Sequence, residues 1–228
     1  MHRPSKMQAI GRLALADRVY EEIFASIVDG RLVAGAGISI DGVARDLTVS
    51  TTPVREALAR LESTGLVLRV ALKGYRVAPL FTKAELAELM DARLVIEPAN
   101  TLRACQQATP ELIHAMEQAN TDLSNAPRGL AFADFRDAWA ADERFHNLIA
   151  EGCDNRFILR AYRSLGGQIQ RFRYFSEVGM ADPAFLVEEH AAILTAFVAR
   201  DSEKARDAMI AHIAGVTRRS IADFEEGV

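Results

Sequence analysis

Apolar residues recur at helical spacing near the start of the chain. Leu15, Val19, Ile23 and Ile27 follow one another at intervals of four residues, which places them on one face of a helix. Gly30 comes directly after this pattern, and glycine commonly marks the end of a helix. We therefore predict an amphipathic helix that ends near Gly30 and buries its apolar face.

Two further helical patterns follow, separated by a short turn. Apolar residues at positions 40, 43, 44 and 47 predict a short helix, and Val54, Leu58 and Leu61 predict a longer one. The longer helix begins at residues 50–52, because hydroxyl side chains cap helix starts and a following proline fits the first turn. A helix, a short helix, a turn and a helix form the plan of a helix-turn-helix.

The exposed side of the longer helix carries groups that suit nucleic acid. Thr51, Thr52 and Arg55 lie away from its apolar stripe. We expect Ser50 and Thr52 to contact phosphates, since a helix N-terminus attracts anions. Arg55 is long enough to bind guanine O6 and N7 in the major groove. Arg45 on the preceding short helix is a further phosphate candidate, although an ordinary solvated face would also explain it.

A β-rich stretch follows this helix. Two short runs flank Lys73 and Gly74, the first rich in leucine and valine and the second containing tyrosine and valine. This pattern is typical of a β-hairpin. A hairpin in this place is the wing of a winged helix. Lys73 at its tip is placed to reach a phosphate or the minor groove.

Beyond residue 83 the pattern is helical throughout. Proline, glycine and polar residues interrupt it at 109–110, 125–129, 152–155, 179–183 and 201–202. These breaks leave six segments of about 15 to 25 residues, and no strand pattern is present among them. We therefore predict a mainly α protein, with a winged helix-turn-helix followed by an antiparallel bundle of about six helices.

Composition and charge narrow the class of protein. The first 80 residues carry 11 Lys/Arg against 8 Asp/Glu, whereas the remainder carries 16 against 23, so a mildly basic module precedes an acidic one. No apolar run reaches the roughly 18 residues that a membrane span needs, and the start lacks a signal peptide's apolar core. We expect a cytoplasmic protein without membrane contacts, whose two cysteines are buried free thiols.

Four polar residues lie on otherwise apolar faces of three predicted helices, namely Asp142, His146, His190 and His212. Asp142 and His146 are one helical turn apart, so their side chains point to the same side. One carboxylate and three imidazoles form a nitrogen-rich site of the kind that binds zinc, nickel or another divalent ion. A histidine on an apolar face is also common as a packed core residue, and the pattern leaves both explanations open.

The span from about residue 17 to 79 resembles the DNA-binding domain of the GntR family of bacterial transcription regulators. That family's motifs are Ser-Arg-Thr-Pro-Val-Arg-Glu-Ala-Leu, then Leu-x-x-x-Gly-Leu-Val, then a glycine-tipped wing. They match residues 50–58, 61–67 and 73–74. Thr51 departs from the motif, where the family usually has arginine, and Thr48 stands where glycine is common. The resemblance implies binding to double-stranded DNA, with Arg55 as the main base-reading residue.

The helical half resembles the FCD ligand-binding domain of the FadR-type branch of this family. Metal-binding members use an Asp-x-x-x-His pair and two later histidines, which correspond to Asp142, His146, His190 and His212. They commonly have an arginine that meets a ligand carboxylate, and Arg93 matches it. The resemblance implies a divalent transition metal, zinc or nickel, and a small carboxylic or sugar acid as effector.

These features together predict a homodimeric transcription regulator that acts as a repressor. We expect a flexible tail at 1–12, a winged helix-turn-helix domain at 13–79, a linker at 80–83 and an FCD-type effector and dimerisation domain at 84–228. A twofold protein would read a palindromic operator. The alternatives are a metal-dependent hydrolase built on the Asp/His cluster, and a DNA-binding dimer with no small-molecule effector.

Overall fold

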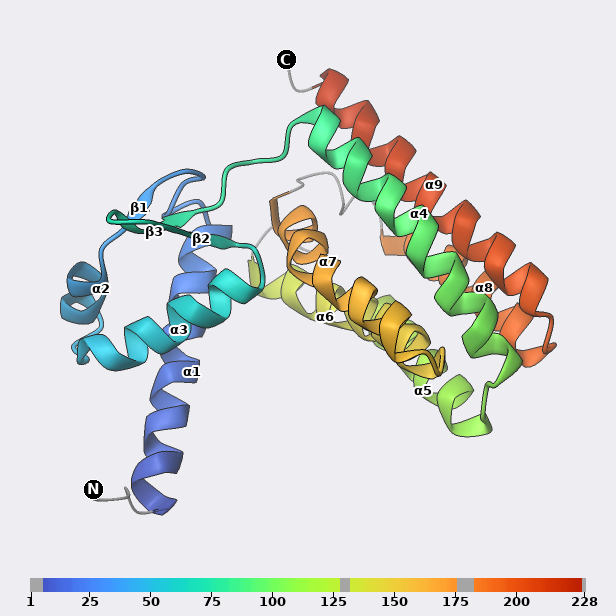
Figure 1. Cartoon of the computed structure of the whole chain (residues 1–228), viewed down its shortest axis with the longest axis horizontal. Coiled ribbons are helices and arrows are strands. Elements are labelled where there is room, and N and C mark those ends of the chain that lie inside the picture. Colours follow the sequence, from blue (N-terminus) through green and yellow to red (C-terminus); the bar gives the residue numbers. More distant parts are fainter. Residues whose placement is uncertain (1–5, 128–131, 176–182, 227–228) are drawn as a thin grey trace. The chain divides into compact units, whose positions relative to one another are not determined.

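The chain forms two compact units, residues 1–80 and 81–228 (Figure 1). The structure is a computed structural model, and it describes residues 6–127, 132–175 and 183–226. Each unit has its own core and is described by itself.

The first unit is a winged helix. Its elements in order are α1 (Lys6–Val28), β1 (Gly37–Ile38), α2 (Ile40–Asp46), α3 (Thr51–Ser63), β2 (Val67–Val70) and β3 (Gly74–Val77). The strands form an antiparallel sheet in the order β1-β3-β2. Helix α1 packs against α3, and the predicted apolar stripes supply the core between them, because Val19, Ile23, Ile27, Leu58 and Leu61 are at most 3% exposed.

The first helix differs from the prediction in two respects. It begins at Lys6, so residues 6–12, predicted as part of a flexible tail, are helical. These residues include alanine, methionine and glutamine, which favour the helix intrinsically. A helix can therefore form here without a repeating pattern of apolar residues. Leu15 was expected to face the core but is 36% exposed, and Ala16 is buried in its place. An exact four-residue repeat drifts round a helix of 3.6 residues per turn, so one end of such a stripe leaves the core.

Local chemistry sets the ends of α2 and α3. Ser39 caps α2 by accepting a hydrogen bond from the Gly42 backbone N–H. Thr48, in the turn between the two helices, has a positive φ of 54°. Only glycine adopts this left-handed conformation without strain, which explains why glycine is common at this position. Helix α3 ends at Ser63 with Thr64 as its C-cap, and Gly65 follows with a φ of 72°, the left-handed conformation that glycine adopts after helix ends.

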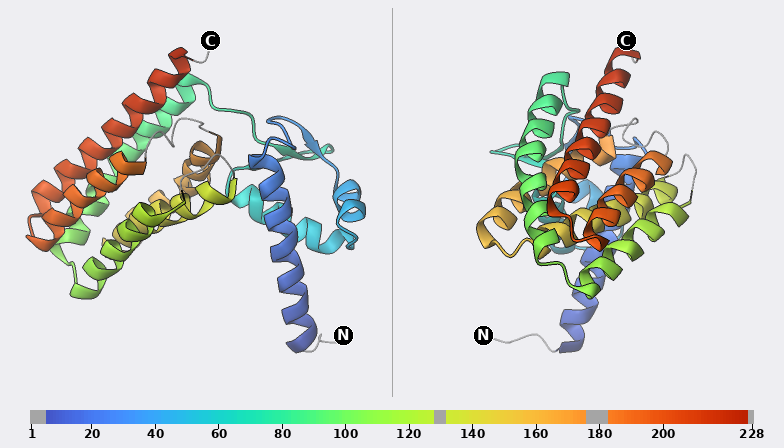
Figure 2. Two further views of the ribbon diagram at one scale, coloured as in Figure 1. Left: turned by 180° about the vertical axis from the view of Figure 1, so that it is seen from behind. Right: turned by 90° about the vertical axis from the view of Figure 1, so that its right-hand side faces the viewer.

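The second unit is an all-helical bundle, and six helices lie in its described residues. They are α4 (Lys83–Gln106), α5 (Pro110–Asn125), α6 (Phe132–Gly152), α7 (Arg156–Phe175), α8 (Pro183–Val198) and α9 (Ser202–Glu226). Helices α4 and α9 run side by side in opposite directions, as both views show (Figures 1 and 2). The start of α4 is fixed by a capping box in which Thr82 and Glu85 exchange hydrogen bonds.

The core of the bundle is drawn from the inner faces of all six helices. Phe145, Phe197 and Met116 are among its largest fully buried side chains. The same inner faces also carry buried polar residues, which lie on α4, α6, α8 and α9. Within the described ranges, no helix combines the length and the apolar character that crossing a membrane requires.

Candidate metal centre and DNA-reading helix

The exposed face of α3 carries the residues predicted to read DNA. Thr52 and Arg55 are exposed, whereas Thr51 is half-buried. Ser50 is the N-cap and is exposed, and its hydroxyl makes no capping hydrogen bond, so it is available to a phosphate. Helix α3 therefore presents two hydroxyls and one guanidinium at its N-terminal half.

The neighbouring basic residues are distributed over two other elements. Arg45 is exposed in the last turn of α2. Lys73 lies in the exposed turn between β2 and β3, and Gly74 follows with a φ of 82°, which explains the need for glycine there. Arg60 behaves differently, because it forms an ion pair with Asp17 of α1 and its guanidinium lies 4.5 Å from the centre of the Tyr20 ring. Arg60 joins α3 to α1, as a helix-packing residue would.

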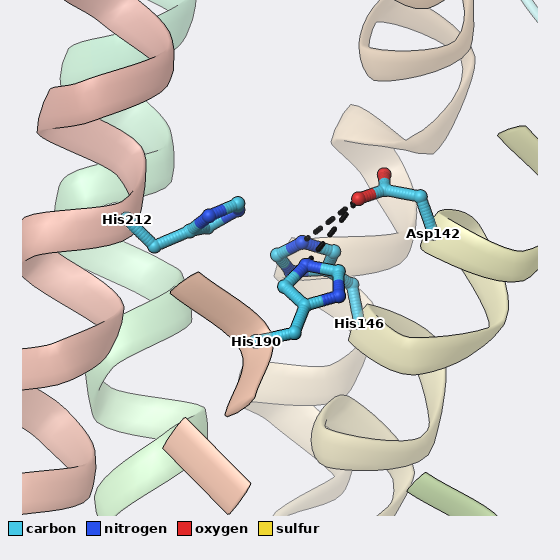
Figure 3. Close-up of side chains that lie close together, drawn as sticks. All are labelled: Asp142, His146, His190 and His212. Atoms are coloured by element: carbon cyan, nitrogen blue, oxygen red, sulfur yellow. Dashed lines mark ion pairs between the residues drawn. The ribbon is translucent and has the colours of Figure 1, made fainter. Parts of the chain in front are cut away.

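The structure brings the four predicted metal ligands together in the bundle. Asp142 and His146 project from α6, His190 from α8 and His212 from α9 (Figure 3). All four are buried, and one ligand atom from each lies within 4.8 Å of the others. Residues that are far apart in the sequence thus converge on one point between three helices.

The donor atoms suit a divalent ion. Asp142 Oδ1 lies 3.4 Å from His190 Nε2 and 3.8 Å from His146 Nε2. Two ligands of one tetrahedral zinc ion lie about 3.3 to 3.6 Å apart, since each is about 2.0 to 2.2 Å from the metal. The distance to His190 matches this separation, and the distance to His146 is slightly longer. In the described part of the chain, His146 Nε2 and His212 Nε2 are buried without a hydrogen bond. Buried nitrogens with free lone pairs are costly unless something binds them, so the donor set fits a metal.

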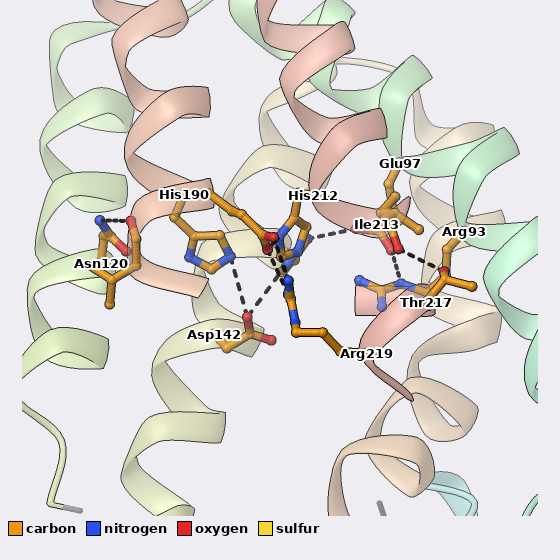
Figure 4. Close-up of polar contacts among 12 residues, drawn as sticks. Arg93, Glu97, Asn120, Asp142, His190, His212, Ile213, Thr217 and Arg219 are labelled. Atoms are coloured by element: carbon orange, nitrogen blue, oxygen red, sulfur yellow. Dashed lines mark hydrogen bonds and ion pairs between the residues drawn. The ribbon is translucent and has the colours of Figure 1, made fainter. Parts of the chain in front are cut away.

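A buried ion pair on α4 supports His146. Arg93 Nε donates a hydrogen bond of 2.6 Å to Glu97 Oε1, and both side chains are 4% exposed. The other carboxylate oxygen of Glu97 lies 2.7 Å from His146 Nδ1. Burial raises the pKa of Glu97, but Arg93 and His146 outweigh it and hold that pKa well below its ordinary value. Glu97 is therefore an ionised link between the predicted effector arginine and a predicted metal ligand. Figure 4 shows Arg93 beside Glu97 on α4.

A second carboxylate supports His212. Glu189 Oε2 lies 2.9 Å from His212 Nδ1, and Arg219 binds both oxygens of Glu189 at 2.8 and 2.9 Å. Burial raises the pKa of Glu189, but the hydrogen bonds from His212 and Arg219 lower it overall. Burial also lowers the pKa of His212, against the opposing hydrogen bond to Glu189. A lowered pKa favours the neutral imidazole, which is the form that binds metals.

Sequence reasoning missed Glu97 and Glu189. Glu97 follows Arg93 by one helical turn, and that spacing is a usable signal for an ion pair. Glu189 lies beside the apolar stripe of α8 rather than on it, so its contact with α9 could not be anticipated from periodicity.

Comparison with known proteins agrees with both halves of this description. Residues 15–77 match the family described as bacterial regulatory proteins, gntR family, and residues 88–215 match the FCD domain. The "Probable D-xylose utilization operon transcriptional repressor" of Paenarthrobacter nicotinovorans is 30% identical, over 89% of this chain and 87% of its own length. The HTH-type transcriptional repressor RspR of Escherichia coli is 26% identical, over 86% and 84%.

Solved structures show the same fold. Escherichia coli McbR/YncC superposes with a TM-score of 0.66 at 20% identity, covering 93% of this chain and 98% of that one. The family matches cover the winged helix and most of the bundle, and the members of this family are regulators. The chain therefore belongs to the GntR family of bacterial transcription regulators, carries an FCD domain, and is a DNA-binding regulator rather than a metal-dependent hydrolase.

Proposed function

We propose that this regulator is a homodimeric repressor whose binding to a palindromic operator is controlled by a small organic acid. The acid binds at a divalent metal, zinc or nickel, held by Asp142, His146, His190 and His212. The observation that carries the proposal is the convergence of these four buried ligand atoms within 4.8 Å. A bound divalent ion would offer further coordination positions to a carboxylate.

Arg93 is the residue that we assign to the acid. Its guanidinium is buried, Nε is held by Glu97, and Nη1 contacts Met90 Sδ at 3.7 Å. Thioether sulfur is a weak acceptor, so a carboxylate would be a better partner for the terminal N–H groups. Arg93 therefore favours an acidic effector, and a small carboxylic or sugar acid fits a buried site of this kind.

Repression is supported by the names of relatives, two of which are described as repressors. A dimer is supported by the size of the reading head, since one recognition helix covers only a few base pairs. Control by the acid requires that it bind the operator-competent and the incompetent arrangement with different affinities.

The proposal is tested by a gel shift on the DNA upstream of the regulator's own gene. The full chain is first stripped with a chelator and then reloaded with zinc or nickel, and a panel of small carboxylic and sugar acids is added. We expect at least one acid to release the DNA from the metal-loaded protein at a concentration that leaves the stripped protein bound. If none of the acids changes DNA binding, with or without metal, the result would favour the alternative of a DNA-binding dimer that has no effector.

Replacing Arg55 with alanine should weaken operator binding by about 1 to 3 kcal/mol, because a bidentate contact to guanine is lost. The preference for one base pair in each half-site should relax as well. Arg18→Ala removes the same charge from an exposed site on α1 and is the matched control. Equal weakening in the two variants, measured by titration of operator and scrambled DNA, would argue against base reading by Arg55.

Replacing Arg93 with lysine should abolish or strongly weaken the response to the acid while leaving operator binding intact. Lysine keeps the charge beside Glu97 but cannot form the two parallel hydrogen bonds of a guanidinium, so roughly a tenfold higher acid concentration should be needed. Arg103→Lys makes the same change on the same helix, where Arg103 donates to the Cys153 carbonyl. An unchanged response in the Arg93 variant would remove this residue from the effector site.

A further inference from the structure

Helices α8 and α9 carry a hydrogen-bonded chain of three side chains at the edge of the metal cluster. Arg219 binds both oxygens of Glu189, at 2.8 and 2.9 Å, and Glu189 Oε2 lies 2.9 Å from His212 Nδ1. His212 is fully buried, whereas Arg219 and Glu189 are about one quarter exposed. The chain of contacts thus runs from partly hydrated groups to a buried imidazole.

A glycine makes room for this arrangement. A Cβ atom added at Gly215 would come within 2.5 Å of Glu189 Oε1 and 3.1 Å of Arg219 Nη1. Gly215 lies inside α9, where glycine is unfavourable relative to alanine by roughly 1 kcal/mol. Helix α9 therefore contains an unfavourable residue beside the Glu189 carboxylate.

The contact has a definite consequence for His212. An imidazole that donates from Nδ1 keeps its lone pair on Nε2, and Nε2 of His212 is buried at the cluster. A carboxylate behind a metal-binding histidine fixes the ring orientation and raises the basicity of the ligand nitrogen. Phe185 adds a further restraint, since the Arg219 guanidinium lies 5.6 Å from the centre of its ring.

We propose that Glu189, clamped by Arg219 over Gly215, is a positioning residue that holds His212 with Nδ1 protonated and Nε2 directed at the metal. This inference rests on the proposed metal site. It adds that the affinity of the site depends on three helix positions outside the four ligands, Glu189, Gly215 and Arg219, and that α8 contributes through Glu189 as well as through His190.

The test uses the full chain and two variants that leave all four ligands in place. Glu189→Gln removes the charge of the carboxylate, and Gly215→Ala displaces it without removing any polar group. The matched controls are Glu188→Gln, an exposed neighbour, and Gly166→Ala, where an added Cβ meets nothing within 4 Å. Zinc affinity is measured by chelator competition, and the tautomer of His212 in metal-free protein is read from the nitrogen-15 spectrum of the imidazole.

We expect both variants to bind zinc about 10 to 100 times more weakly than the wild type, and both controls to bind as the wild type does. His212 should be the Nδ1–H tautomer in the wild type and a mixture of tautomers in Glu189→Gln. The helix content should stay constant, which separates loss of positioning from loss of fold. If the wild type binds zinc, and both variants bind it with the same affinity and keep the same His212 tautomer, the role of Glu189 is overturned and the metal site still stands. A wild type that binds neither zinc nor nickel would overturn both.

Discussion

Replacing Glu97 with alanine is expected to lower the free energy of unfolding of the helical unit by about 3 to 5 kcal/mol. The substitution leaves the Arg93 guanidinium buried at 3% exposure without the carboxylate that neutralises it. A desolvated, unpaired charge is among the most destabilising changes that a single substitution can make. Urea unfolding followed by tryptophan fluorescence measures it, since Trp139 is the single tryptophan and lies in α6.

Two further variants separate the charge effect from a general loss of packing. Glu88→Ala, at an exposed position of the same helix, should change stability by no more than about 0.5 kcal/mol. Arg93→Met combined with Glu97→Leu removes both charges and should recover most of the lost stability, because apolar side chains can replace a buried ion pair. If Glu97→Ala lowers the free energy of unfolding by less than about 1 kcal/mol, water reaches the Arg93–Glu97 ion pair.

Replacing His190 with alanine or phenylalanine should reduce the affinity for zinc at least about 100-fold, more than the loss of a supporting residue. His190 is fully buried, and its ring stacks on Phe145 with centroids 3.9 Å apart. Phenylalanine can preserve that aromatic stack while offering no ligand atom, so the pair of variants separates packing from coordination. Chelator competition on the full chain gives the affinity directly.

The loss of zinc affinity in the His190 variants should also appear as a smaller zinc-dependent rise in melting temperature. Zinc at 100 times its dissociation constant stabilises a folded site by about 2.7 kcal/mol, so the wild type should melt at a higher temperature with zinc than without it. The shift should fall to a small fraction of the wild-type value in both His190 variants and persist in His114→Ala, which alters a histidine whose side chain is 80% exposed. A zinc-dependent shift that survives His190→Phe would contradict this assignment.

The sequence predicts most of the fold because the features involved are local. The stripes of α3 and of the bundle helices are set by spacing within one helix, and the wing by a glycine in a short hairpin. Strand β1 was not predicted, since two residues are too few to show alternation. It forms by pairing Gly37 with Arg76 and Ile38 with Tyr75 of β3, a contact between residues about 40 positions apart.

The candidate site divides in the same way. Asp142, His146, His190 and His212 could be named from sequence because each interrupts an apolar stripe that must face the core. Their partners could not, because Glu189 meets His212 only through the packing of α8 against α9. An apolar stripe thus identifies which polar residues enter a core, whereas the identity of their partners depends on how the helices are arranged.

The spread of the cluster over α6, α8 and α9 also bears on the unfolded chain. His146 and His190 are about 40 residues apart, and His190 and His212 about 20, so binding one ion in the unfolded chain would require closing two long loops. That entropic cost falls on the unfolded state, whereas the folded bundle already holds the four donors together. An ion bound here would therefore act as a reversible cross-link of α6, α8 and α9, and a chelator would lower the cooperativity of their unfolding.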